Sequence, residues 1–469
     1  MQSFPQKEDA IKFLTEKGIK ILNLCHIPED GRLKTLSFSA TDKERLKEVL
    51  ELGERVDGSS LFSFIEPGKS DIYIKPLLNQ AFVNPFAPLP TLNILCSYMD
   101  QDGKPLDVAP QTVLARAEEK LASPFGVTLK ALAELEFYIF SKMENEPLFP
   151  ASPDKNYHES APFSLFENVR NEILATLAEI GIPTKYTHSE VGRLKAEGNM
   201  LFEQHEVELA SQSLADLASV VPVAKWVIRN VCAKHGVSAS FVPKIALEHA
   251  GTGMHIHLCA LKNDKNIVAD SDGNLSLEAK KMIGGILKLA SSLSAFGNPT
   301  PISYLRFVAR KESPMHICWS ARNRLALIRI PLWWKFDKTM RNKSNCRETF
   351  EYRGPDAFAN CHLLLAGITL AVNHGLASSA ESLAAAEALQ VDAADKGHKL
   401  KSLPRSCFEA AESLEKDRAF YEAGSVFSKR LIDKTIEKLK AYHDKDLWKN
   451  LSDKPQEIQK IVSQFMHYG

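Results

Sequence analysis

The chain has eight cysteines, and no two of them stand in a C-x-x-C pair. Zinc modules and disulfide-stapled domains both depend on closely spaced cysteines, so the pattern indicates neither class and a reducing compartment is expected. An excess of charge of either sign is also missing, because Lys plus Arg and Asp plus Glu both number 58. Without a basic surplus, no nucleic-acid partner and no binding to an anionic membrane are expected.

Long apolar runs are scarce as well. Residues 1–20 mix Lys, Glu and Asp where a signal peptide has a continuous apolar core. The longest uncharged run, Ala357–Ala380, contains two histidines and two asparagines, which favours a buried helix over a membrane span. We therefore expect a cytoplasmic protein with no membrane partner.

The length of 469 residues exceeds what one hydrophobic core usually organises, so a small domain and a large one are expected. Up to about Pro110, short apolar segments broken by Gly and Pro predict a compact mixed domain with one helix, Lys43–Leu52. Its strands are predicted at Lys20–His26, Leu33–Phe38, Asp71–Lys75 and Thr91–Met99. Pro105–Pro110 reads as a linker, and we divide the chain into domains 1–108 and 109–469.

The larger part alternates charged strands with amphipathic helices, whose apolar residues recur at spacings of three and four. Helices are predicted at Gln111–Leu121, Glu167–Ile180, Leu214–His235 (with a kink or break at Pro222), Ser276–Ala295 and Phe408–Ala441.

The segment Gly251–His257 carries the clearest chemical signal. Read as a strand, it places His255, His257 and Cys259 on one face and apolar residues on the other. The glycine-rich entry lets backbone approach a ligand, and a neutral imidazole can bind a metal or donate to a phosphate. An ordinary strand with two half-exposed histidines is the alternative.

Acidic strands repeat this design. Glu134 and Glu136 share one face of a strand whose other face is apolar, and Glu351 lies on a similar short segment. Like charges side by side on a half-buried strand repel unless a cation neutralises them. A solvated strand face explains any one of these residues, but not the whole set, which is Glu134, Glu136, Glu190, Glu206, His255 and Glu351.

Five carboxylates and one imidazole form an oxygen-rich ligand set, which selects Mg²⁺ or Mn²⁺ rather than Zn²⁺. Gln204 and Glu208 share a strand face with Glu206. A cationic set accompanies these ligands: Arg306, Arg322, Arg324, Arg329 and Arg353. Surface ion pairing is the alternative for Arg322 and Arg324, but the run Ser320–Pro331 reads as one apolar strand in which buried guanidinium groups need an anion. Carboxylate-bound metals beside arginines suit phosphoryl transfer.

Seven motifs occur in one order along the chain: Asp57-Gly58-Ser59-Ser60 followed by Ser70-Asp71, Glu134-Leu135-Glu136, Gln204-His205-Glu206, Gly251–His257, Asn298-Pro299-Thr300 with Ser303-Tyr304-Leu305-Arg306, Ser320-Ala321-Arg322-Asn323-Arg324, and Glu351–Asp356. In these motifs the sequence resembles the glutamine synthetase family, of the bacterial type, over nearly its whole length.

The resemblance implies an α+β fold, with a small β-grasp N-terminal domain and a large catalytic domain that has an antiparallel sheet and flanking helices. It also implies a homo-oligomer with active sites between subunits, as a dodecamer of two stacked hexameric rings. The implied activity joins ammonia to the γ-carboxylate of glutamate through a γ-glutamyl phosphate. The cofactors would be ATP as co-substrate and two or three Mg²⁺ or Mn²⁺ ions.

The resemblance also implies roles for single residues. One metal would be held by Glu136, Glu190 and Glu206, and the second by Glu134, His255 and Glu351. ATP would be contacted by His257, Arg329 and Cys259, the transferring phosphoryl group by Arg324 and Arg353, and glutamate by Arg306 and Gly251. Asp57 of an adjacent subunit would bind ammonium and take its proton, and Glu312 would close over the intermediate. An ordinary turn aspartate is the alternative for Asp57.

The sequence departs from the family pattern at several positions. Ala250 replaces a usual asparagine, Cys259 a serine, and Gly354 a phenylalanine, so that Ala250 and Gly354 are expected to open space near the amino-acid substrate. Insertions fall at Gly192–Asn199 and Trp333–Arg347, and Thr349 stands where the family has an arginine. Two alternatives to glutamine formation follow, a γ-glutamyl ligase for a larger amine and a non-catalytic structural or regulatory relative.

Overall fold

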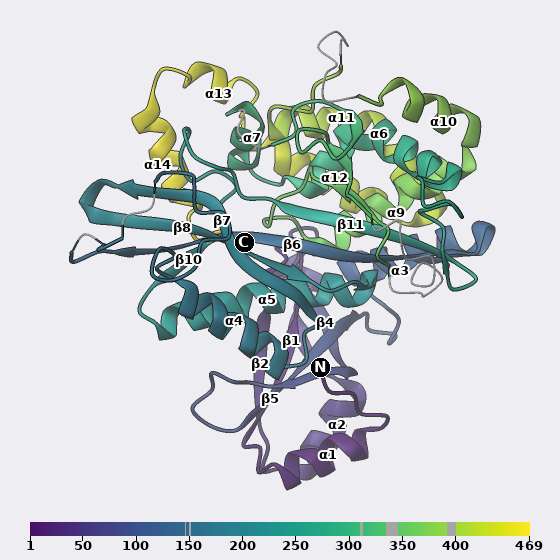
Figure 1. Ribbon diagram of the computed structural model, residues 1–469. Coiled ribbons are helices and arrows are strands. Elements are labelled where there is room, and N and C mark those ends of the chain that lie inside the picture. The colour runs from purple at the N-terminus through teal and green to yellow at the C-terminus, as the bar shows by residue number, and fades with distance from the viewer. Residues whose placement is uncertain (146, 150–151, 310–312, 334–345, 392–399) are drawn as a thin grey trace.

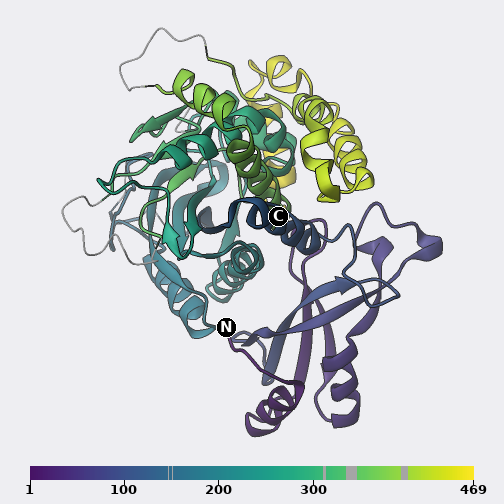
Figure 2. The ribbon, with the colours of Figure 1, turned by 90° about the vertical axis from the view of Figure 1, so that its right-hand side faces the viewer.

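The computed structural model describes residues 1–145, 147–149, 152–309, 313–333, 346–391 and 400–469. Within these ranges the chain forms an α+β fold with two separate sheets, as the sequence predicts. The five-stranded N-terminal sheet and its helices project from the side of the larger C-terminal part (Figure 2). Strand β5 ends at Met99 and helix α3 begins at Pro110. We therefore retain 1–108 and 109–469 as the proposed domain division.

The N-terminal sheet has the strand order β2-β1-β5-β4-β3, in which β1 and β5 are parallel and the other neighbours antiparallel. The strands are β1 (Ile21–His26), β2 (Lys34–Ser39), β3 (Glu54–Asp57), β4 (Asp71–Val83) and β5 (Thr91–Met99). Helix α2 (Lys43–Leu52) lies where the sequence predicts it. Helix α1 (Lys7–Glu16) was not predicted, although it buries Ala10 and Leu14 and packs Ile11 and Phe13 partly against the core.

The larger sheet follows the order β13-β14-β15-β11-β6-β8-β7. These strands are β6 (Val127–Lys142), β7 (Thr184–Ala196), β8 (Met200–Leu209), β11 (Met254–Lys262), β13 (Trp319–Ala321), β14 (Ile328–Ile330) and β15 (Phe350–Tyr352). Three short strands pair with its inner strands: β9 (Gln212–Ser213) and β10 (Ser238–Ser240) with β6, and β12 (Lys265–Asn266) with β11. The sheet is mixed rather than wholly antiparallel, because β13 and β14 run parallel.

The parallel pair also corrects the single apolar strand predicted over Ser320–Pro331. A turn from Arg322 to Leu327 separates β13 from β14, and Arg322 has a left-handed φ of 70°. The side chains of Arg322 and Arg324 are exposed on this turn, so neither is a buried guanidinium.

Helices lie on both sides of the larger sheet (Figure 1). They are α3 (Pro110–Phe125), α4 (Glu167–Glu179), α5 (Leu214–Lys234), α6 (Leu277–Gly297), α7 (Pro301–Val308), α9 (Cys361–Ala377), α10 (Ser379–Ala388), α11 (Cys407–Glu422), α12 (Lys429–Lys440), α13 (Leu447–Asn450) and α14 (Pro455–Phe465). Helix α5 continues through Pro222. The long helix predicted at Phe408–Ala441 is instead two helices, because Gly424 has a left-handed φ of 70° between them.

Helix α9 is buried along most of its length, as the uncharged run predicts. In the part of the chain that the structure describes, no single helix is long and apolar enough to cross a membrane. Helices α9 and α10 would pass that test together, but a bend of 106° separates them.

Candidate active site

A cavity of about 330 Å³ opens on one face of the larger sheet. Its lining is mostly charged: Glu134, Glu136, Tyr157, Lys185, Tyr186, His188, Glu190, Gln204, Glu206, Glu208, Gly251, His255, His257, Arg306, Ser313, Arg324, Arg329, Pro331, Leu332 and Arg353. Most of the residues that the sequence predicts as site residues therefore meet in one place.

Strand register explains how these residues converge. Side chains two positions apart share a strand face, and opposite residues on paired strands are close neighbours. Three rows of opposite residues cross the sheet: His255–Glu134–Glu208–Tyr186, Glu136–Glu206–His188, and His257–Glu351–Arg329. Carboxylates thus lie opposite carboxylates on β6 and β8, with imidazoles on both flanks.

Glu134 lies between the two histidines of β11. Its Oε2 is 2.8 Å from His255 Nδ1, and its Oε1 is 2.8 Å from His257 Nε2. Burial opposes ionisation of Glu134, but the attraction of His257 and the two imidazole contacts outweigh it and hold the pKa of Glu134 well below its usual value. Burial opposes the charged form of His257 too, yet Glu134 raises the pKa of His257.

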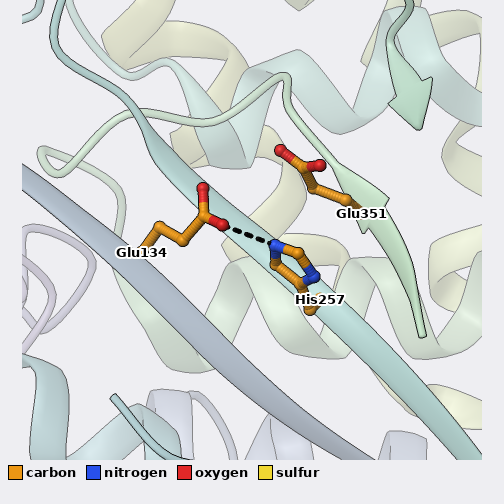
Figure 3. A group of neighbouring side chains, drawn as sticks. All are labelled: Glu134, His257 and Glu351. Carbon is orange, nitrogen blue, oxygen red and sulfur yellow. Dashed lines mark hydrogen bonds and ion pairs between the residues drawn. The ribbon is translucent and has the colours of Figure 1, made fainter. Parts of the chain in front are cut away.

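Glu351 on β15 is fully buried and lies beside Glu134 and His257, behind the residues that line the cavity. Figure 3 shows its carboxylate near the contact between Glu134 and His257, with the three side chains coming from three strands. Arg329 Nη1 donates to Glu351 Oε2 at 2.8 Å, and Arg353 Nη1 donates to Oε1. Burial would raise the pKa of Glu351, but Arg353 and His257 lower it. Glu351 is therefore an anion held by two arginines.

The opposite end of the cavity is dominated by repulsion. Glu206 is buried, and burial together with neighbouring carboxylates, chiefly Glu134 and Glu136, raises its pKa well above the usual value. His188 Nε2 lies 3.1 Å from Glu206 Oε1, and His188 Nδ1 lies 3.7 Å from Glu190 Oε1. A bound cation would relieve this repulsion.

Glu208 extends the acidic end. Lys185 Nζ donates to Glu208 Oε1 at 2.6 Å, whereas Glu208 Oε2 is buried and has no hydrogen-bond partner among the described residues. The side chain of Glu208 is only 1% exposed. A buried carboxylate oxygen without a partner is costly, and it is the kind of atom that a divalent cation coordinates.

Three groups of ligand atoms lie close enough together to hold a metal ion, with all atoms of a group within 4.8 Å of one another. They are Glu134, His257 and Glu351; His188, Glu190 and Glu206; and Glu134, Glu206 and Glu208. The first two groups each differ in one member from a ligand set implied by the resemblance, and the third, with Glu208, corresponds to neither set. His257 and His188 are candidate ligands in addition to the expected ones, since His255 Nδ1 also lies 2.8 Å from Glu134 Oε2 and 3.6 Å from Glu351 Oε1. The oxygen-rich donor set fits Mg²⁺ or Mn²⁺.

Glu136 accepts hydrogen bonds from groups of the protein itself. Its Oε2 accepts hydrogen bonds from the Gly253 backbone N–H at 2.6 Å and from Gln204 Nε2 at 3.4 Å. At Gly253 an added Cβ would lie 2.6 Å from the His255 ring and 2.8 Å from Arg306 Nη2, so only glycine fits.

The guanidinium group of Arg306 also donates hydrogen bonds to backbone carbonyls. Its Nη1 donates to the carbonyls of Gly354 and Pro355 at 3.0 and 3.1 Å, and its Nη2 donates to the carbonyl of Arg353 at 3.0 Å. Arg306 thereby fixes the chain that follows β15 beside the cavity. Binding of a substrate carboxylate by Arg306 stays a prediction.

The other predicted residues fall in different places. Arg324 lies over the Tyr157 ring, 5.9 Å from its centroid, at the exposed rim of the cavity. Asp57 is exposed on the N-terminal domain and does not line the cavity of its own chain. Glu312 lies outside the described residues, as does most of the insertion predicted at Trp333–Arg347.

At two positions where the sequence departs from the family pattern, Cys259 and Gly354, the structure differs from what the sequence indicates. Cys259 is bonded to Cys346 in a disulfide, which the scattered spacing of the cysteines did not indicate, and Cys259 does not line the cavity. The pair joins residues 87 positions apart, which spacing along the sequence cannot detect. Gly354 does not open space either, because an added Cβ would lie 2.9 Å from the Tyr352 hydroxyl.

Sequence reasoning missed several residues of the cavity, namely Tyr157, Lys185, Tyr186, His188 and Glu208, as site residues. His188 stands two positions before Glu190 on the same strand, and the alternation of Thr187–Glu190 could have revealed it. Tyr157 comes from a loop far from every motif, and only the fold brings it to the cavity.

Comparisons with known proteins agree with this architecture. A family model described as the glutamine synthetase catalytic domain matches residues 107–457, and one described as the glutamine synthetase β-grasp domain matches residues 18–101. A solved structure of Plasmodium falciparum glutamine synthetase has a TM-score of 0.80 at 21% identity, and the match covers 95% of this chain and 98% of that one. This likeness supports the fold.

Curated relatives extend over almost the whole length. Glutamine synthetase of Thermotoga maritima is 32% identical, with 95% of this chain and 96% of that protein covered. Glutamine synthetase of Aquifex aeolicus is 30% identical, covering 93% and 95%. A protein of Cupriavidus pinatubonensis named 3-hydroxylaminophenol mutase is also 30% identical, covering 92% and 94%. The chain belongs to the glutamine synthetase family.

Proposed function

We propose that the protein is an ATP-dependent ligase that joins ammonia to the γ-carboxylate of L-glutamate and forms glutamine. ATP would phosphorylate the γ-carboxylate, and ammonia would then displace phosphate from the γ-glutamyl phosphate. The observation that carries the proposal is the cavity in which Glu134, Glu206 and Glu208 converge beside Arg329 and Arg353. Phosphoryl transfer needs this combination, because its catalysis is positioning and neutralisation of phosphate oxygens.

Two or three Mg²⁺ or Mn²⁺ ions would be held by the three ligand groups of the cavity. Bound there, they would neutralise the phosphate oxygens of ATP. Glu351 belongs to one of these groups, and Arg353 and His257 lower its pKa while Arg329 donates a hydrogen bond to it. Both arginines also face the cavity, where their guanidinium groups suit phosphate oxygens.

A second subunit would complete the part of the site that binds ammonium. Asp57 is a strong candidate for binding ammonium, because hydrogen bonds from Ser60 and Ser59 keep its carboxylate ionised and lower its pKa. It lies outside the cavity of its own chain, so the proposal requires a homo-oligomer in which a neighbour supplies it. A dodecamer of two stacked hexameric rings meets that requirement.

A γ-glutamyl ligase for a larger amine is the second candidate. Tyr157 and Tyr186 are 44% and 45% exposed and line the cavity next to its carboxylates. Aromatic faces beside anions suit an organic ammonium group through cation–π attraction. Against it, the space expected at Gly354 is filled by Tyr352. A non-catalytic role is disfavoured, because a cavity of repelling carboxylates has no structural benefit.

A label-transfer experiment tests the proposed reaction. Glutamate carrying heavy oxygen in its γ-carboxylate is incubated with the protein, ATP, Mg²⁺ and ammonium, and the phosphate released is analysed by mass spectrometry. The proposal expects one labelled oxygen in each phosphate, because the carboxylate oxygen attacks the γ-phosphoryl group and leaves with it. Unlabelled phosphate would show that water, and not glutamate, accepts the phosphoryl group.

A further inference from the structure

The disulfide between Cys259 and Cys346 lies where the pairing of β11 with β15 ends. Backbone register between these strands runs from Ile256–Tyr352 through His257–Glu351 to Leu258–Phe350 and stops there. Cys259 is the next residue of β11, and its Cα lies 5.4 Å from that of Cys346. The disulfide therefore joins the two segments at the point where the backbone hydrogen bonds between β11 and β15 end.

Two further contacts attach the same segment, residues 346–349, to the hairpin of β11 and β12. Thr349 Oγ1 lies 3.2 Å from His257 Nδ1. Asn266 Nδ2 donates to the Glu348 carbonyl at 2.9 Å and to Glu348 Oε2 at 3.2 Å. Both are hydrogen bonds, so the disulfide is the strongest of the three attachments.

The segment leads directly into the site. Glu351 follows Cys346 by five residues, and His257 precedes Cys259 by two. Both residues belong to one of the ligand groups of the cavity. Any loosening of residues 346–349 is therefore transmitted to the strand that positions Glu351 and Arg353.

The remaining cysteines contrast with this pair. Six cysteines are free and buried: Cys25, Cys96, Cys232, Cys318, Cys361 and Cys407. Burial raises the pKa of Cys25, Cys232 and Cys361 to about 12, so these thiols form little reactive thiolate. The sulfurs of Cys259 and Cys346 are buried as well, so the pair differs from the six free thiols in being joined by a disulfide and not in its exposure.

We propose that Cys259 and Cys346 form a reversible thiol–disulfide modification site, whose oxidation fixes the β15 end of the active site and whose reduction loosens it. The site is formed by two buried sulfurs, so exchange requires local opening of residues 346–349. The partner is a small thiol or disulfide of the glutathione class, or a dithiol reductant.

The exchange balances in both directions. A thiolate of the dithiol attacks one sulfur of the pair and forms a mixed disulfide, and the second thiol of the reductant then releases it. Two electrons and two protons pass to the protein, which gains two thiols, and the reductant becomes a disulfide. In reverse, glutathione disulfide accepts two electrons and two protons from the pair and leaves as two glutathione molecules.

The first test counts thiols in the full-length protein. After incubation with glutathione disulfide, or with dithiothreitol, the protein is denatured in acid and its thiols are titrated. Six thiols are expected after oxidation and eight after reduction, and peptide mass spectrometry should find Cys259 joined to Cys346. Eight thiols after oxidation would overturn the proposal.

The second test follows amide hydrogen exchange over residues 346–352 in both redox states. Reduction should accelerate exchange there by about tenfold or more and leave the N-terminal sheet unchanged. The variants C259A and C346A should behave as the reduced protein and lose the redox response, whereas C96A, a free cysteine of the N-terminal sheet, should keep it. Equal exchange in both states of the unmodified protein would contradict the proposal without reliance on any variant.

The third measurement is ATP binding, and it alone rests on the proposed function. Reduction is expected to raise the Kd of ATP severalfold, because Glu351 and Arg353 lose part of their support. If ATP binds in neither state, the proposed function fails, while thiol counting and hydrogen exchange still decide on the disulfide. If ATP binds equally well in both states although exchange differs, the control of the site by the pair is refuted.

Discussion

Glu134 and Glu208 lie directly opposite each other on β6 and β8, and both side chains line the same cavity. Directly opposed like charges destabilise a sheet by up to about 1 kcal/mol per pair. In this protein, the histidines of β11 flank Glu134 and Lys185 holds one oxygen of Glu208. The other oxygen of Glu208 remains for a ligand.

Replacing Glu208 by Gln should therefore weaken Mn²⁺ binding by at least about tenfold, since a carboxylate ligand is lost, while thermal stability changes little. Isothermal titration with Mn²⁺ and melting curves measure both. Glu203 provides the matched control, because it lies on the other face of β8, where Ser164 and Arg193 bind it. Glu203→Gln should lower stability by roughly 1–3 kcal/mol and leave Mn²⁺ affinity unchanged. The opposite pattern would remove Glu208 from the metal site.

Glu351→Ala should abolish turnover. The change removes a ligand group member and also leaves Arg329 and Arg353 without the anion that they share. ATP should still bind, although with a Kd raised severalfold or more, because the other two ligand groups remain. Glu351→Gln keeps the shape and removes the charge, so it shows whether the loss of activity comes from the missing anion or from the missing side chain. Glu179→Ala, an exposed glutamate at the end of α4, should behave as the unmodified protein. Near-normal γ-glutamyl transfer by Glu351→Ala would contradict the proposed role.

Stability should depend on pH through His26 in the N-terminal sheet. His26 Nδ1 lies 2.7 Å from the Tyr98 hydroxyl, and burial, with a contribution from Lys34, lowers the pKa of His26 from 6.5 to about 4. The unfolded chain therefore takes up a proton at pH values where the folded chain does not. This contribution to stability is present above pH 6.5 and is lost as the pH falls from 6.5 to 4, by up to about 3 kcal/mol.

Melting temperatures between pH 7.5 and pH 4.5 check this expectation. His26→Phe should be less stable at neutral pH, because the hydrogen bond with Tyr98 is lost, but should show a flatter pH profile. An unchanged profile in His26→Phe would assign the acid sensitivity to other groups.

Asp57→Ala should reduce glutamine formation strongly, while glutamate-dependent formation of the acyl phosphate persists. The loss should depend on ammonium concentration, because Asp57 is proposed to bind ammonium and to take its proton. Asp42→Ala is the matched control, since Asp42 caps helix α2 of the same domain, and its loss should cost about 1 kcal/mol of stability without changing the ammonium response. An unchanged ammonium response in Asp57→Ala would leave Asp57 as a turn residue.

Mixing two inactive variants tests whether neighbouring subunits share the site. Asp57→Ala and Glu351→Ala are dissociated together and reassembled. Some mixed interfaces should then combine an intact Asp57 of one subunit with an intact Glu351 of the next, and partial activity should return. No recovery from assembled mixtures would contradict the requirement for a neighbour.

Much of the fold followed from the sequence because strand alternation and helical periodicity are local. The extents of β5 and α2 agree with their predicted ranges, and the acidic and imidazole faces of β6 and β11 do point into one cavity. Distant pairings were not accessible in this way. The turn after β13 divides a run that reads as a single strand, and its left-handed Arg322 has no signal in residue type.

Which side chains of the candidate active site contact one another depends on the register of the paired strands. Because β11 places both histidines near Glu134, the sequence alone could not show that His257 as well as His255 lies close to Glu134 and Glu351. His188 joins Glu206 only because β7 pairs with β8 at that position. Cys346 reaches Cys259 through the same kind of long-range contact.

The acceptor assay tests the central claim most directly. Purified protein is given ATP, Mg²⁺ and L-glutamate, alone, with ammonium, or with single amines from a panel that includes diamines and arylamines, and ADP and the amide product are quantified. The account predicts that ammonium gives glutamine and ADP in equal amounts and far exceeds every other acceptor. Formation of a γ-glutamylamide from an organic amine with little glutamine, or no glutamate-dependent ADP under any condition, would contradict it.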